Sequence, residues 1–145
     1  MARFLVYAVV FGFADPEAHF AVRRAAEDAA RRLATPACQQ VIVDFGLRPP
    51  PDVVASFQQL RLFDDHAAAA CGTHRNTLAF TEPGSRLVHV CGQRFKDRLL
   101  RHPLLAVAVV IHEFLHALGL GENPPSSEAI TQRVLARCGG SDATP

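Results

Sequence analysis

What this sequence lacks first of all is an excess of charge of either sign. Its 15 Lys and Arg residues nearly balance its 14 Asp and Glu residues, and the formal net charge is +1. This balance excludes the global basic field of a nucleic-acid-binding protein and the long acidic tail of some interaction proteins. Tryptophan is absent, and Tyr and Met occur once each. With 49% hydrophobic and 20% charged residues over 145 positions, the composition is that of one globular domain with a core, not of a disordered chain.

The sequence also lacks an apolar run long enough for a stable membrane span. The run from Phe4 to Phe13 follows a single basic residue, Arg3, and ends near small residues at Gly12 and Ala14. These features predict a signal peptide over residues 1–14, after which Asp15 begins a helix as its N-cap. The alternative is a first buried β-strand in a cytoplasmic protein, since the run is rich in Val and Phe.

Paired cysteines at CxxC spacing are missing as well, which argues against a zinc site built from cysteines. The even count of four favours two disulfides in an exported chain. We expect the pairs Cys71–Cys91 and Cys38–Cys138, and hence a secreted or periplasmic protein. The alternative is four reduced, buried cysteines in the cytosol.

The remaining patterns predict an α+β fold in one domain over residues 15–138, with a flexible tail at 139–145. An amphipathic helix is expected over 16–34, a short helix between Asp52 and about Leu60, and an irregular segment over 61–76. Residues 41–45 fit either a strand or a helix. Two strand-like segments, 77–81 and 86–91, flank a Pro-Gly turn and predict a β-hairpin. A buried helix is expected over 103–118 and a last helix over 127–137, with Ser126 as its cap.

One stretch, Ile111-His112-Glu113-Phe114-Leu115-His116, places ionisable groups in the continuation of an apolar helix. Residues four apart lie on the same face of a helix, so His112 and His116 can hold one metal ion. Glu113 is then close enough to reach a water on that metal. Burying a carboxylate and two imidazoles is costly unless something pairs them, and a divalent cation would pair all three. The pattern therefore predicts one zinc ion per chain with Glu113 as general base.

The longer string HExxHxxGxxE, from His112 to Glu122, resembles the metzincin metallopeptidase motif HExxHxxGxxH. The resemblance makes His112 and His116 the first two ligands, Gly119 the turn glycine and Glu122 the third ligand. Glutamate replaces the usual His or Asp but is a competent zinc ligand. The Met-turn of metzincins has no counterpart, since Met1 is the only methionine.

More loosely, residues 77–138 are similar to small secreted zincin-like bacterial proteins, which implies a minimal zincin-like domain. In gluzincin-like proteins the third ligand is a glutamate on a separate downstream helix, and Glu128 is the alternative on that ground. In zincins a strand edge holds the substrate backbone, and strand 86–91 is the candidate. His89 and Arg86, with His74 and Arg75, are candidates by residue type for stabilising an oxyanion.

The expected function is a zinc metallopeptidase acting as a monomer on a peptide or protein, with no nucleic-acid partner. Two alternatives remain at this stage. One is a zincin-like module that binds zinc without catalysis, although a structural site has no need of Glu113. The other is a metal-dependent hydrolase of a non-peptide substrate.

Overall fold

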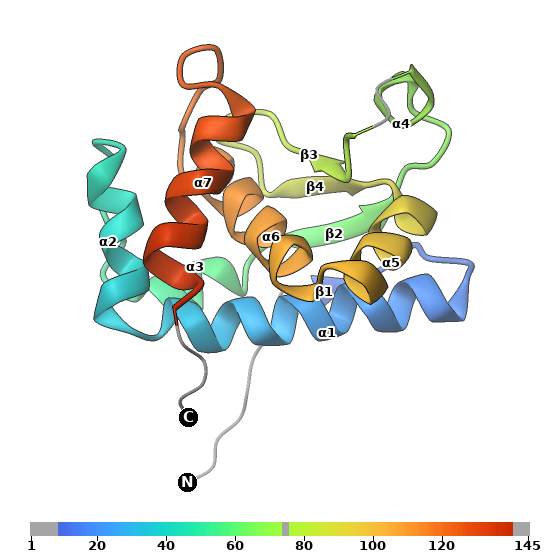
Figure 1. The fold of residues 1–145 in the computed structure, drawn as a ribbon, viewed down its shortest axis with the longest axis horizontal. Coiled ribbons are helices and arrows are strands. Elements are labelled where there is room, and N and C mark those ends of the chain that lie inside the picture. The colour runs from blue at the N-terminus through green and yellow to red at the C-terminus, as the bar shows by residue number, and fades with distance from the viewer. Residues whose placement is uncertain (1–8, 74–75, 141–145) are drawn as a thin grey trace, which may run out of the picture.

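A computed structural model describes residues 9–73 and 76–140, where seven helices accompany one four-stranded mixed sheet (Figure 1). The fold class is α+β, as the sequence predicts. The helices are α1 (Pro16–Leu33), α2 (Pro36–Asp44), α3 (Val53–Phe57), α4 (Ala69–Thr73), α5 (Gly92–Arg101), α6 (Pro103–Ala117) and α7 (Ser127–Cys138). The strands are β1 (Val9–Val10), β2 (Arg61–Asp64), β3 (Ala79–Phe80) and β4 (Leu87–Val90).

The sheet has the order β1-β2-β4-β3, which leaves β3 at one edge. β1 and β4 run parallel to β2, while β3 and β4 form the predicted antiparallel hairpin. The prediction that the 86–91 strand is the substrate-binding edge is wrong. β4 pairs with β2 along its whole length and with β3 at His89 and Val90, so it is an inner strand of the sheet. The free edge next to α6 belongs to β3.

Helix α6 is the centre of the core, as its apolar sequence predicts. It lies between α7 on one side and α5 on the other, with α1 running across beneath it (Figure 1). Phe114 is fully buried and meets the Phe57 ring edge to face, with 5.5 Å between ring centroids. All five residues from His112 to His116 are buried. The motif therefore sits on a helix that is buried in the core.

Several local predictions need correction. Residues 61–76 are not irregular, since β2 and α4 lie there. Of the two alternatives for residues 41–45, the helix is found: 41–44 continue a helix that begins at Pro36, with Thr35 accepting a hydrogen bond from the Cys38 amide as N-cap. Helix α5 was not predicted at all, although it is strongly amphipathic and buries Phe95. The last helix begins as predicted, with the Ser126 hydroxyl accepting from the Ala129 amide.

Both predicted disulfides are present. Cys71–Cys91 joins α4 to the residue that precedes α5, and Cys38–Cys138 joins α2 to the end of α7. The α2–α7 contact also carries an ion pair of Asp44 with Arg137, at 2.7 Å. Hydrogen bonds from Arg137 hold the pKa of Asp44 below its usual value, against the opposing effect of desolvation. Helix α7, which forms one wall of the site below, is thus fixed covalently and electrostatically. Two disulfides fit an oxidising compartment.

Part of the predicted signal peptide is visible as structure. Val9 and Val10 pair with Arg61 and Leu62, so this part of the apolar run forms a strand, although Val9 is exposed and the strand is not the buried one of the alternative interpretation. Residues 1–8 of the predicted signal peptide and 141–145 of the predicted tail lie outside the described residues. Across residues 9–73 and 76–140, no helix combines the length and apolarity needed to cross a bilayer.

Candidate metal centre

His112 and His116 lie one turn apart on α6 and direct their rings toward one another. Their Nε2 atoms are 3.1 Å apart, and each residue is only 4% exposed. Two nitrogens bound to one tetrahedral zinc at about 2.05 Å would lie about 3.3 Å apart. The pair is therefore spaced as two ligands of one ion.

The other nitrogen of each ring is already engaged. His116 Nδ1 lies 2.7 Å from the carbonyl oxygen of Leu120, and His112 Nδ1 lies 2.8 Å from the hydroxyl of Thr131 on α7. A carbonyl oxygen only accepts, so His116 Nδ1 carries the proton and Nε2 presents a lone pair. Histidine ligands of metals are commonly oriented through their second nitrogen in this way. Neither Leu120 nor Thr131 was singled out from the sequence, because each contributes through a contact that only the fold creates.

Glu122 completes the group because the chain turns back after α6. Gly119 has φ +115°, in the region that favours glycine, which fits its predicted role as turn residue. Glu122 Oε1 then lies 3.0 Å from His116 Nε2. Ligand atoms of His112, His116 and Glu122 all fall within 4.8 Å of one another. Glu128 lines the same cleft but lies outside this group.

The chemistry of these donors calls for a positive charge between them. With the proton of neutral His116 on Nδ1, its Nε2 lone pair faces a carboxylate oxygen, and the Nε2 atom of His112 is close to both. Three electron-rich atoms at such distances repel unless a proton or a cation lies among them. Burial, with a smaller contribution from His116, lowers the pKa of His112 to about 3, so this ring is neutral and carries no positive charge at neutral pH. The donor set of two imidazoles and one carboxylate fits a zinc ion.

Glu113 lies beside this group and is 4% exposed. Its Oε1 has no hydrogen-bond partner among the described residues, and neither has the nearby Thr81 hydroxyl. Burial raises the pKa of Glu113 to about 8; the proximity of Thr81 opposes this shift, and the charge of Glu122 adds a smaller increase. Thr81 is close enough to affect the charge of Glu113 but does not have the geometry of a hydrogen bond. A buried, unpaired carboxyl with a pKa near neutrality can both take up and release a proton.

These residues open into a cleft of about 760 Å³. Its floor is α6, its two walls come from α5 and α7, and the β3 edge runs along it. The hairpin is fixed to α6 where the Gly84 amide donates to the carbonyl oxygen of His116, at 2.8 Å. The metal group and the strand edge therefore share one rigid frame.

The predicted oxyanion residues do not face this cleft. His89 stacks on Phe80 at 4.5 Å between ring centroids and pairs with Asp65 at 2.9 Å through Nδ1. Side chains alternate along β4, and its buried neighbours Val88 and Val90 face the core, so His89 points to the other face of the sheet. Arg86, just before β4, is exposed and is not part of the cleft lining. Neither residue is among those that line the cleft, so their predicted role has no support from the cleft geometry, and His74 and Arg75 lie outside the described residues.

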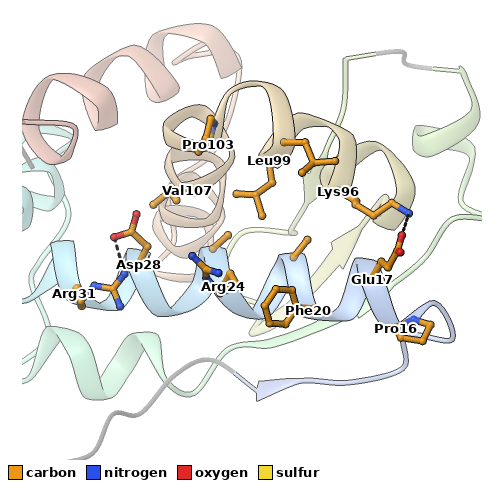
Figure 2. A pocket seen from close by; sticks show the side chains of 13 residues that line it. Pro16, Glu17, Phe20, Arg24, Asp28, Arg31, Lys96, Leu99, Pro103 and Val107 are labelled. Carbon is orange, nitrogen blue, oxygen red and sulfur yellow. Dashed lines mark hydrogen bonds and ion pairs between the residues drawn. The ribbon is translucent and has the colours of Figure 1, made fainter.

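A second hollow, of about 680 Å³, lies between α1 and the α5–α6 pair (Figure 2). Apolar side chains such as Phe20 and Leu99 line it, and ion pairs of Lys96 with Glu17 and of Arg31 with Asp28 flank it. It contains none of the predicted site residues. The predicted site residues that line a hollow are therefore all in the α6 cleft.

No model of a protein family, no curated protein and no solved structure significantly matches this chain. The functional argument consequently depends on the geometry of the site and on the motif.

The two pKa shifts predict how the stability of the chelator-treated protein depends on pH. The pKa of His112 in the folded state, about 3, lies below its ordinary value of 6.5. The contribution of His112 to the free energy of unfolding is therefore lost as the pH falls from 6.5 to 3. The pKa of Glu113 in the folded state, about 8, lies above its ordinary value of 4.5. The contribution of Glu113 to the free energy of unfolding is therefore lost as the pH rises from 4.5 to 8. Between pH 4.5 and 6.5 the two residues change the free energy of unfolding in opposite directions. Above pH 6.5, of these two residues only Glu113 changes it.

We therefore expect Glu113→Gln to remove the loss of stability between pH 6.5 and 8. Urea unfolding of the wild type and the variant, in a chelator and at half-unit steps of pH, measures the difference in their free energies of unfolding. Groups that titrate in both proteins contribute equally and cancel in this difference. A difference in stability that does not change over this range would contradict the assigned shift.

Proposed function

We propose that this chain is a zinc-dependent metallopeptidase. The observation that carries the proposal is the convergence of ligand atoms from His112, His116 and Glu122 beside the buried carboxyl of Glu113. A structural zinc site tends to be closed by four protein ligands, whereas three ligands leave a position for water. The motif resemblance supports the same conclusion.

Each residue of the site has a distinct task in this proposal. His112, His116 and Glu122 hold the ion, and Thr131 and the Leu120 carbonyl orient the two imidazoles. When bound there, zinc would lower the pKa of a water molecule and polarise the carbonyl of the substrate. Glu113 accepts the proton from the attacking water and delivers it to the nitrogen of the leaving amine. The low polarity that raises the pKa of Glu113 makes its carboxylate a stronger base toward the attacking water.

The β3 edge supports a peptide as the substrate. An exposed strand edge presents free backbone N–H and C=O groups, which an extended peptide can pair with as an added strand. A purely zinc-binding module would have no use for Glu113, whose buried, unpaired carboxyl lowers stability. We further propose that the protein is secreted or periplasmic, acts as a monomer and carries one zinc, in keeping with its two disulfides.

The test uses the oxidised, zinc-loaded chain and a mixture of synthetic peptides covering diverse sequences. We expect internal cleavage detected by mass spectrometry, its loss in 1,10-phenanthroline, and its return when zinc is added back. Absence of cleavage, or cleavage that is insensitive to the chelator, would contradict the proposal.

A further inference from the structure

Arg98 is a half-buried cation on the α5 wall of the cleft. Across residues 9–73 and 76–140, its guanidinium has neither an ion-pair nor a hydrogen-bond partner. Arg94, one turn earlier on the same helix, has a structural role, since it donates to the carbonyl oxygens of Thr77, at 2.8 Å, and Cys71. The two arginines thus differ in that Arg98 has donors available in the cleft.

The position of Arg98 relative to the metal group follows from the helices. Arg98 precedes the first turn of α6 by a few residues, whereas His112 lies near the other end of that helix. Leu105, near Arg98, and His112 both line the cleft. They are separated by seven residues, which corresponds to about 10 Å along a helix.

The β3 edge links these two ends of the cleft. Thr77, just before β3, is held by Arg94 at the α5 side, and Gly84, beyond β3, is held by His116 at the metal side. An extended peptide advances about 3.3 Å per residue. In a peptide lying along this edge, the residue three or four positions away from the one at the metal would therefore reach Arg98.

The surroundings of Arg98 favour an anion. Apart from the two histidines, the other ionisable side chains that line the cleft, Glu113, Glu122 and Glu128, are acids located on α6, on α7 or between them. Glu128 disfavours an anionic group at the α7 end, while the Arg98 guanidinium, which shares the cleft lining with apolar Leu105 and Val109, can bind a carboxylate through paired hydrogen bonds. We propose that Arg98 forms a subsite for a substrate carboxylate, three or four residues from the bond that is cleaved. This subsite rests on the proposed peptidase function.

The experiment uses paired peptides that differ by a single Glu or Gln, with that residue moved through each position around a fixed cleavage site. A second set ends at the same positions with either a free carboxylate or an amide, which distinguishes a side-chain acid from a chain end. We expect the wild type to favour the acid at one position, three or four residues from the cut, by about tenfold in kcat/KM. Arg98→Gln should bring this ratio close to one, and Arg98→Glu should favour Lys at that position. Arg101→Gln is the matched control, since Arg101 is exposed at the end of α5 outside the cleft lining.

The same peptides are also tested for binding to the zinc-loaded Glu113→Gln variant, with and without Arg98→Gln, by fluorescence anisotropy. A preference for Glu over Gln that requires Arg98 supports the subsite even if the wild type cleaves nothing, an outcome that would contradict only the peptidase function. Cleavage or binding without any acid preference, or a preference that survives Arg98→Gln, would overturn the subsite.

Discussion

The Glu113→Gln variant is expected to retain zinc and to lose peptide hydrolysis by roughly 10²- to 10⁴-fold in kcat. Glutamine has the same shape as glutamate, so it preserves the packing of a residue that is 4% exposed. It cannot accept a proton from water or return one to an amine. Because Glu113 is not among the three residues whose ligand atoms converge, its loss leaves the metal group intact.

The measurement combines kcat and KM on a cleaved peptide with zinc content per chain by atomic emission. Glu128→Gln is a matched control, since it makes the same chemical change on an exposed residue of the same cleft. Turnover by Glu113→Gln equal to that of the wild type would remove Glu113 as the general base. Loss of zinc in this variant would instead indicate that Glu113 is a ligand.

Removing a ligand should have a comparably large effect on metal affinity. We expect His112→Ala and Glu122→Ala each to weaken zinc binding by more than the 10- to 100-fold that loss of a residue orienting a ligand typically costs. Thr131→Val should fall within that smaller range, because Thr131 only orients His112, at 2.8 Å. Glu128→Ala should leave zinc affinity unchanged.

Zinc affinity is measured by competition with a chromophoric chelator, and circular dichroism verifies that each variant is folded. Comparing Glu122→Ala with Glu128→Ala identifies the third ligand, since each variant removes one carboxylate from the same cleft. Zinc loss in Glu128→Ala with retention in Glu122→Ala would transfer the third ligand to α7. Full retention in His112→Ala would contradict the metal site itself.

The helical parts of this fold were accessible from the sequence because their signals are local. Pro103 at the start of α6, Gly119 at its end and the Ser126 cap of α7 each act within a few residues. β2 was missed because its four residues, Arg61–Asp64, have no clear alternation, and their strand conformation depends on parallel partners far away in the chain. α5 was missed despite its amphipathic pattern, since it follows the hairpin directly without a side-chain N-cap.

The residues of the candidate site likewise fall into those that local spacing predicts and those that only the tertiary fold brings together. His112, Glu113 and His116 are related by the period of one helix, so their arrangement follows from spacing alone. Thr131 and Arg98 come from two different helices, and only the tertiary packing brings them to the cleft. His89 illustrates the limit of residue type as a signal, because it was a candidate by type alone and the fold pairs it with Asp65 and Phe80, outside the cleft lining.

The two disulfides have a consequence for when the site can form. Cys38–Cys138 closes on α7, which supplies Thr131, while Cys71–Cys91 joins the segment before β3 to the start of α5, which supplies Arg98. Before these bonds form, both walls of the cleft are held only by packing and ion pairs. A newly made, reduced chain would therefore have a loosely ordered cleft, and oxidation would act as a maturation step. The proposed hydrolase would then gain its full activity only where both disulfides can form.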